Sequence, residues 1–191
     1  MNEPGMADGL VGQLLVASPA LGDPTFTRSV ILLLDHDEAG ALGVVINRPT
    51  PVDVAEVLPS WEPFATQPGV LFRGGPVAAD SALGLAALPG VGEEEPLGWR
   101  RVTEGLGLVD LDTPPEIIAA EMADLRIFAG YAGWSAGQLE AELEEGAWYV
   151  VPARQRDAFS DDPDRLWRSV LRRQGGDLAF VSTYPDDPSM N

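Results

Sequence analysis

The stretch Arg126–Ala153, RIFAGYAGWSAGQLEAELEEGAWYVVPA, decides the fold class that the sequence predicts. It begins with a short apolar run that contains aromatic residues, Arg126–Tyr131, and this composition is typical of a buried strand. It ends with a second apolar run, Trp148–Val151, which Pro152 terminates. Between the two runs, leucines fall on one face of an acidic segment and predict an amphipathic helix. The stretch therefore predicts a strand, a glycine-rich turn, a helix and a second strand.

Ser135 has two competing interpretations in this unit, as a helix cap or as a nucleophile. Ser135 and Gln138 have the S-x-x-Q spacing of a capping box, and Gly146 is a typical helix stop. Residues 133–137, GWSAG, also match the G-x-S-x-G elbow of serine hydrolases, whose chemistry requires a histidine that follows the serine. The single histidine, His36, lies far upstream. We therefore interpret Ser135 as the cap of the helix.

Outside this unit, short apolar runs alternate with turns that are rich in glycine and proline. Further strands are predicted near residues 13–17, 29–35, 42–47, 70–73, 82–88, 99–102 and 106–111. Further helices are predicted at residues 51–58, from Thr113 to about Asp124, and from Asp162 to Gly175. Because hairpins are mixed with helices without a regular βαβ alternation, the sequence predicts an α+β fold with mixed or antiparallel strands and about four short helices.

The length of the chain, 191 residues, is that of one domain with a substantial core. Residues 1–9 are small and polar and predict a disordered N-terminal lead-in, so residues 10–191 are predicted to form a single compact domain. The sequence contains no run of 18 apolar residues and begins without a basic leader. We therefore expect a cytoplasmic protein with no membrane partner.

The composition excludes several classes of chemistry. The chain has no cysteine, which excludes disulfides, thiol catalysis and thiolate metal sites. A single histidine does not indicate a histidine-based zinc or iron site, and we predict no metal and no cofactor. The formal net charge of −18 repels nucleic acid, so we expect no nucleic-acid partner.

Two arginines beside predicted turns suggest an anion-binding site. Arg48 follows the strand near 42–47, and Arg73 ends the strand near 70–73. Two glycines after Arg73 leave backbone N–H groups uncovered, and the start of the predicted helix offers another set. We predict that these turns converge on one concave surface, a candidate anion pocket made by Arg48, Arg73, Gly74, Gly75, Trp134 and Ser135. The alternative is that the arginines pair with some of the 30 acidic residues, the glycines only turn the chain, and Trp134 belongs to the core.

Two further constellations have simpler explanations. Asp35-His36-Asp37 places carboxylates beside an imidazole, as a general base requires, but neighbouring residues in a strand or turn point in different directions. We interpret His36 as a solvated turn residue. Four glutamates could be read as metal ligands, and we interpret them instead as the solvated face of a helix: Glu140, Glu142, Glu144 and Glu145.

Several long blocks of the chain resemble the YqgE/AlgH family of bacterial proteins. They are GQLLVASPALGDPTFTRSVILLLDHDEAGALGVVINRP at residues 12–49, FRGGPV at 72–77, GYAGWSAGQLE at 130–140, WYVV at 148–151, and STYP at 182–185. The resemblance extends in order over nearly the whole chain, and such long matched blocks make it far more specific than a short motif. It implies a compact cytoplasmic α+β domain with no established catalytic activity. Some members carry the label of transcriptional regulator.

These observations favour a non-enzymatic cytoplasmic binding or regulatory protein, whose partner is a small anionic ligand or another protein. The first alternative is the transcriptional regulator that the family label suggests, since six of the twelve basic residues lie between residues 154 and 173. Aspartates flank these arginines, and no helix-turn-helix pattern precedes them, so this reading ranks second. A hydrolase that uses Ser135 ranks third. We expect a monomer or a homodimer.

Overall fold

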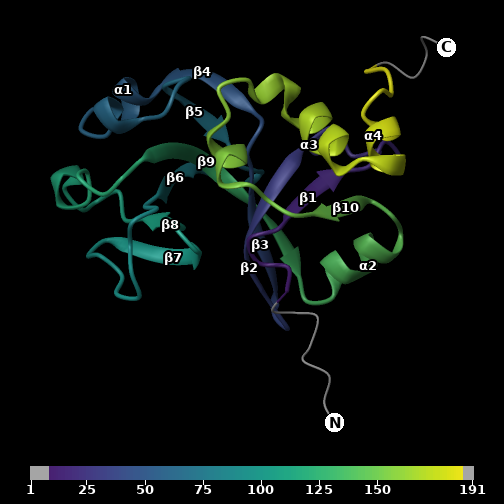
Figure 1. Ribbon diagram of the computed structural model, residues 1–191, viewed down its shortest axis with the longest axis horizontal. Helices are drawn as coiled ribbons and strands as arrows, with labels where there is room; N and C mark the ends of the chain where they lie inside the picture. The colour runs from purple at the N-terminus through teal and green to yellow at the C-terminus, as the bar shows by residue number, and fades with distance from the viewer. Residues whose placement is uncertain (1–8, 187–191) are drawn as a thin grey trace.

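The computed structural model describes residues 9–186, and within them ten strands form one curled sheet (Figure 1). The order is β10-β1-β2-β3-β9-β6-β8-β7, and β4 and β5 extend the sheet from β9. All strand pairs are antiparallel except β5 with β9. The strands are β1 (Leu14–Ala17), β2 (Val30–Asp37), β3 (Gly40–Val45), β4 (Pro49–Asp53), β5 (Val70–Arg73), β6 (Val77–Ala87), β7 (Trp99–Thr103), β8 (Leu106–Val109), β9 (Asp124–Ser135) and β10 (Trp148–Val151).

The described residues also form four α-helices and four short 3-10 helices. The α-helices are α1 (Val54–Val57), α2 (Gln138–Glu144), α3 (Leu166–Gln174) and α4 (Gly176–Val181). The 3-10 helices are η1 (Glu62–Phe64), η2 (Pro115–Ile117), η3 (Gln155–Phe159) and η4 (Pro163–Arg165). This architecture confirms the predicted single compact α+β domain. None of the described helices is both long enough and apolar enough to cross a membrane.

Strand β9 is the centre of the sheet. Its first half pairs with β6 on one side and with β5 on the other, and its second half pairs with β3. The change of partner occurs at Gly130, which has a φ of 73°. A Cβ atom at Gly130 would lie 2.5 Å from the carbonyl oxygen of Gly75, so only glycine allows the β5–β6 turn to approach β9 here. The position of this turn therefore depends on a single residue of β9.

Apolar side chains are buried on both faces of the curled sheet. Leu32 and Leu34 of β2 pack with the apolar side of α3, whereas Ile31 and Leu33 pack with Trp134 and its neighbours. Because successive side chains of a strand point to opposite faces, the continuous apolar run in β2 is buried on both. A third cluster lies under β6, β7 and β8 and contains two buried tryptophans, Trp61 and Trp99.

The structure corrects several predicted boundaries. The predicted strand 126–131 continues to Ser135, because β3 supplies a new hydrogen-bonding partner beyond Gly130. The helix therefore begins at Gln138, with Gly137 as its N-cap at a φ of 77°, and not at Ser135. The segment predicted as a helix from Thr113 to Asp124 forms only the short helix η2 followed by turns.

Two more differences concern the predicted helices. Residues 51–58 are not one helix, since β4 continues to Asp53 before the single turn of α1. The segment after Gly175 forms α4, which the sequence did not predict as a helix. The predicted N-terminal lead-in, residues 1–9, lies almost entirely outside the described residues.

Candidate functional site

Arg48 and Arg73, the two arginines of the predicted site, lie on neighbouring segments. The amide of Arg73 donates a hydrogen bond of 2.8 Å to the carbonyl oxygen of Arg48. Burial lowers the pKa of Arg48, and the Arg73 guanidinium lowers it further, because two cations at close range disfavour each other's charged form. The structure thus brings these two predicted residues together.

Gly74 and Gly75 pack against the backbone of β9 and are buried. The amide of Gly74 donates to Ala129 O at 2.9 Å, and its carbonyl accepts from Val45 N at 2.8 Å. A Cβ at Gly74 would lie 2.3 Å from Gly130 O, and one at Gly75 would lie 2.2 Å from the backbone of Tyr131. These glycines therefore permit close packing of two backbones, and the Gly74 amide is not available to an anion.

Trp134 and Ser135 lie at the far end of β9. Arg73 pairs with Ala129, and Ser135 is six residues beyond that point, roughly 20 Å along an extended strand. The Trp134 side chain is buried in a different cluster from the one beneath Phe72, and its indole Nε1 donates to Glu142 Oε2 at 2.8 Å. This separation corrects the prediction that all six residues share one surface.

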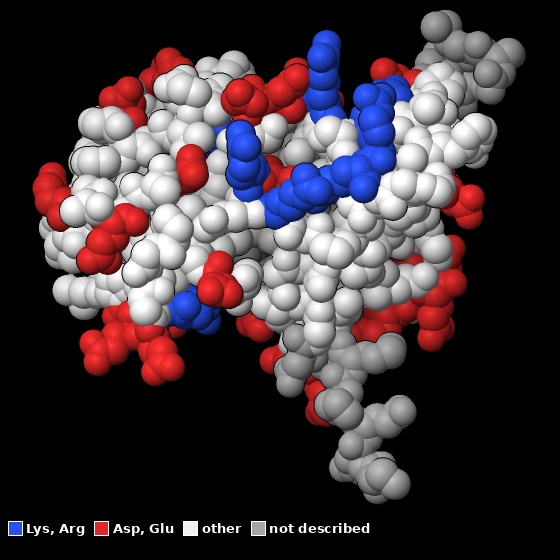
Figure 2. All heavy atoms as spheres, viewed as in Figure 1, with Lys and Arg blue, Asp and Glu red and all other residues white. Residues whose placement is uncertain are grey.

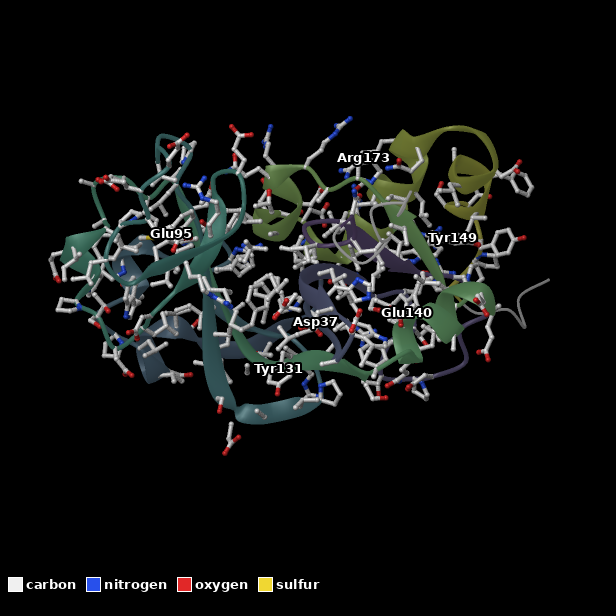
Figure 3. All side chains as sticks on the ribbon, turned by 90° about the horizontal axis from the view of Figure 1, so that it is seen from below. Asp37, Glu95, Tyr131, Glu140, Tyr149 and Arg173 are labelled. Carbon is white, nitrogen blue, oxygen red and sulfur yellow. The ribbon has the colours of Figure 1, made fainter. Side chains whose placement is uncertain are left out.

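The contacts of Ser135 and His36 are those of structural residues. Ser135 Oγ lies 3.3 Å from Gln138 Oε1, and the Ser135 amide donates to the same oxygen at 3.0 Å. The imidazole of His36, predicted to be solvated, is instead buried, with Nε2 2.6 Å from Glu140 Oε1. The pKa of Glu140 is lowered first by its own backbone amide and then by His36. The contact between His36 and Glu140 therefore connects β2 to α2. Figure 3 shows Glu140 beside α2, well apart from Arg173 beside α3.

A different group of residues forms a pocket around Arg48. This pocket, called the arginine pocket below, has a volume of about 330 Å³. Three arginines, an amide, a hydroxyl, an indole and two carboxylates line it: Arg28, Arg48, Arg168, Asn47, Thr27, Trp167, Asp164 and Asp186. Arg48 is the one residue of the predicted site that lines it.

The β2–β3 hairpin builds one wall of the arginine pocket. Ile31 pairs with Val45 in an antiparallel register, so the residues before β2 lie opposite those after β3. The Asn47 side chain fixes this arrangement, since its Oδ1 accepts from Val30 N and its Nδ2 donates to Arg28 O, both at 2.9 Å. Arg28 has a φ of 58°, a left-handed conformation that a residue other than glycine adopts only where its surroundings impose it. The hairpin therefore sets Arg28 and Arg48 side by side.

Helix α3 builds the opposite wall of the arginine pocket. Trp167 is 2% exposed, and its indole Nε1 donates to Ala17 O at 2.9 Å, which fixes the ring against β1. The guanidinium carbon of Arg28 lies 4.2 Å from the centroid of this ring, an arrangement that favours a cation through the π electrons. Arg168 is the next residue of α3 and turns its guanidinium toward the same space. Trp167 therefore forms the rigid floor of the arginine pocket, beneath the guanidinium groups of Arg28 and Arg168.

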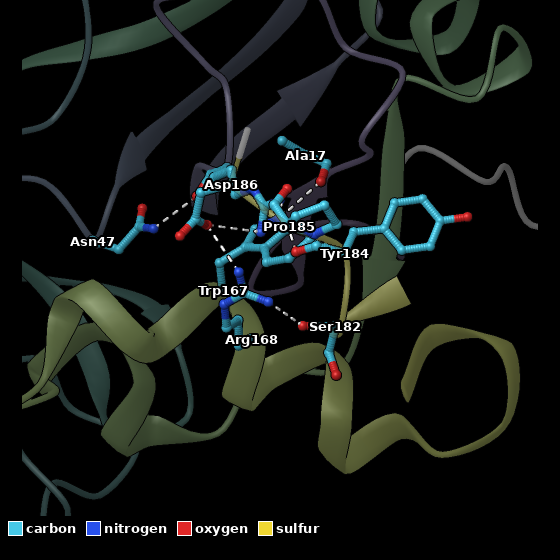
Figure 4. Close-up of polar contacts among 9 residues, drawn as sticks. Ala17, Asn47, Trp167, Arg168, Ser182, Tyr184, Pro185 and Asp186 are labelled. Carbon is cyan, nitrogen blue, oxygen red and sulfur yellow. Dashed lines mark hydrogen bonds and ion pairs between the residues drawn. The ribbon is translucent and has the colours of Figure 1, made fainter. Parts of the chain in front are cut away.

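The carboxylate of Asp186 lies between two of the guanidinium groups (Figure 4). Its Oδ1 is 3.3 Å from Arg28 Nη1 and 2.9 Å from Arg168 Nη2. Burial lowers the pKa of Arg28, the Asp186 carboxylate counteracts this, and the Arg168 guanidinium reinforces it. The third arginine, Arg48, donates to Thr27 O at 2.6 Å. The arrangement can therefore hold an anionic group, and a carboxylate of the chain already occupies part of it.

The sequence contained a signal for half of this site. The hairpin predicted at residues 29–35 and 42–47 implies that Arg28 and Arg48 face each other across its open end, yet Arg28 was not included in the predicted site. No local pattern could place Trp167 or Arg168 there, because they approach from a helix more than a hundred residues later. Among residues 9–186, no group of three or more histidine or acidic side chains is arranged to hold a metal ion.

Comparisons with known proteins agree along nearly the whole chain. The family model DUF179, described as AlgH-like, matches residues 14–179. A UPF0301 protein of Streptomyces coelicolor is 65% identical over 184 residues, which cover 95% of each chain. A UPF0301 protein of Thermobifida fusca is 52% identical over 95% of this chain and 96% of its own length.

Two solved structures share the fold. A protein of Corynebacterium diphtheriae matches with a TM-score of 0.87 at 35% identity, over 96% of this chain and 95% of the other. The AlgH protein of Pseudomonas aeruginosa matches with a TM-score of 0.66 at 30% identity, over 98% of each chain. Sequence, family model and fold thus agree, and this chain belongs to the AlgH-like family of UPF0301 proteins.

Proposed function

We propose that this protein is a non-enzymatic binding protein that recognises a small anionic group, a carboxylate or a phosphate, in the arginine pocket. One observation carries the proposal: the guanidinium groups of Arg28 and Arg168 meet at a carboxylate, with Arg48 lining the same cavity. Guanidinium groups present planar, forked donors that match the oxygens of carboxylates and phosphates. The chain concentrates them here although its net charge is −18.

The electrostatics support a role in binding beyond the stability of the fold. Arg168 lowers the pKa of the partly buried Arg28, and Arg73, which is exposed, lowers the pKa of the partly buried Arg48, so like charges face each other at and beside the pocket. Such an arrangement is unfavourable unless an anion neutralises it. Arg28 Nη1 is buried, and its contact with Asp186 lacks the geometry of a hydrogen bond. The pocket therefore retains a donor that a better-placed anion can use.

The lining supports binding over catalysis. Most of its polar side chains are guanidinium groups and an amide, which orient and hold anionic groups. Two carboxylates complete the lining, and one of them, Asp186, forms ion pairs with Arg28 and Arg168. The serine and histidine that a hydrolase would need have other partners, Gln138 for Ser135 and Glu140 for His36.

Thermal unfolding in the presence of simple anions tests this proposal. Citrate and inorganic phosphate, each compared with sodium chloride at equal ionic strength, should raise the melting temperature in a saturable manner, because a ligand that binds only the folded state stabilises it. Arg48→Gln should reduce the shift at least severalfold. Arg100→Gln, which removes an exposed arginine of β7 distant from the pocket in the sheet order, is the matched control and should keep the full shift. Equal shifts in chloride and citrate, or an undiminished shift in Arg48→Gln, would refute the proposal.

A further inference from the structure

A segment of the chain that follows α4, residues 182–186, contacts the arginines of the pocket, and it is held mainly through its backbone. Arg168 Nη1 donates to Ser182 O at 2.5 Å, and Arg28 Nη2 donates to Tyr184 O at 3.0 Å and also to Pro185 O. The Asp186 carboxylate adds the ion pairs with the same two arginines (Figure 4). Two guanidinium groups thus hold this segment by three carbonyls and one acidic side chain.

Asp186 also lines a second cavity beside the arginine pocket. This second cavity has a volume of about 440 Å³ and shares Asp164, Arg168 and Asp186 with the first. It adds Arg165 of η4 and Arg172 of α3 to the lining. Figure 2 shows that arginines gather on the face of the molecule where α3 lies. The two adjoining cavities together present five arginines, which fits a ligand with more than one acidic group.

The acidic end of the segment is held loosely enough to be displaced. The Asp186 side chain is 83% exposed, although its partners Arg28 and Arg168 are 23% and 32% exposed. Ion pairs with a solvated partner contribute little, and salt screens them. An occupant that is tethered yet weakly paired can exchange with a ligand from solution.

We infer that residues 182–186 are an intramolecular ligand of the arginine pocket, and that the ligand from outside is an acidic peptide that displaces the Asp186 end of this segment. This inference rests on the proposed function and specifies both its ligand class and its regulation. The tether gives the segment an effective concentration that an outside peptide must exceed. The apparent affinity for that peptide is consequently reduced by the fraction of molecules whose pocket is occupied.

Fluorescence anisotropy with two short peptides tests the inference on the full chain. The probe is the labelled, amidated peptide STYPD, which copies residues 182–186, and the matched peptide STYPN lacks only the carboxylate. Because Asp186→Asn weakens the resident segment, that variant should bind STYPD roughly threefold to tenfold more tightly than the wild type. Asp177→Asn removes an exposed charge of α4 outside both cavities and should bind as the wild type does. Arg168→Gln should bind STYPD at least tenfold more weakly than Asp186→Asn.

The outcomes separate this inference from the proposed function. The inference is overturned if the wild type and Asp186→Asn bind STYPD with equal affinity, or if STYPD and STYPN bind equally well. The proposed small-anion function still stands in that case if citrate or phosphate stabilises the protein through Arg48. Tight peptide binding without a shift in citrate or phosphate supports the inference and overturns the small-anion function. Absence of both signals overturns both. If two copies of the protein exchange this segment, light scattering will show a dimer that the Asp186→Asn substitution dissociates. That result would overturn the intramolecular form of the inference.

Discussion

At the scale of the residue, single polar side chains hold the buried parts of this protein in place. Glu142 is the clearest case: its Oε2 accepts hydrogen bonds from the indole Nε1 of Trp134 and of Trp148, both at 2.8 Å. The two rings pack edge to face with centroids 6.2 Å apart. A glutamate predicted to lie on a solvated helix face is therefore the acceptor that joins α2 to β9 and β10.

Glu142→Ala should lower the free energy of unfolding by about 2–3 kcal/mol, because two buried indole donors lose a charged acceptor. Glu144→Ala is the matched control on the same helix; Glu144 is exposed, and its loss should change stability by less than about 0.5 kcal/mol. Urea unfolding followed by tryptophan fluorescence measures both. Equal stability of the two variants would show that the shared acceptor is unimportant.

At the scale of the element, the sequence predicted most strands and misplaced the junction between β9 and α2. Apolar runs identified the strands because burial of such runs depends on local composition. The extension of β9 to Ser135 depends on its pairing with β3, a contact between residues about ninety positions apart that no local pattern contains. One half of the capping box is present, since Gln138 Oε1 accepts from Ser135 N, but the helix begins three residues later.

This difference changes the expected effect of two substitutions at the junction. Ser135→Ala should alter the free energy of unfolding by less than about 0.5 kcal/mol, because Ser135 is exposed and its hydroxyl does not cap the helix. Gly137→Ala should cost about 1 kcal/mol, since Gly137 has a left-handed φ of 77° while its surroundings leave space for a Cβ. Chemical denaturation of both variants decides between the accounts. A larger loss for Ser135→Ala than for Gly137→Ala would restore the serine as the cap.

At the scale of the whole molecule, the site depends on contacts that the sequence shows only in part. The pairing of Arg28 with Arg48 follows from a hairpin that was predicted, whereas Trp167, Arg168 and Asp186 arrive from the other end of the chain. The predicted pocket did not include these three residues, because the prediction grouped the ends of strands without the order in which the strands pair. The net charge did not indicate the site either, because a total of −18 masks a local cluster of arginines.

The arrangement of charge also bears on binding to DNA. Three of the arginines of η4 and α3 are already paired with acids, Arg165 with Asp162, Arg168 with Asp186, and Arg173 with Asp157. Because binding to duplex DNA depends on cations that neutralise phosphates, we predict no specific binding tighter than about 1 μM at physiological salt. Anisotropy with labelled duplexes measures this affinity. Nanomolar, sequence-dependent binding would instead favour a transcriptional regulator.

The most direct test of the central claim is a titration of the ¹⁵N-labelled protein with citrate, followed by NMR at the indole N–H groups of its five tryptophans. Trp167 forms the floor of the arginine pocket, whereas Trp61, Trp99, Trp134 and Trp148 belong to other clusters. The account predicts a saturable shift of the Trp167 indole signal, lost in Arg48→Gln and absent at the other four. Saturable shifts at Trp134 without a change at Trp167, or no saturable shift at any indole, would contradict it.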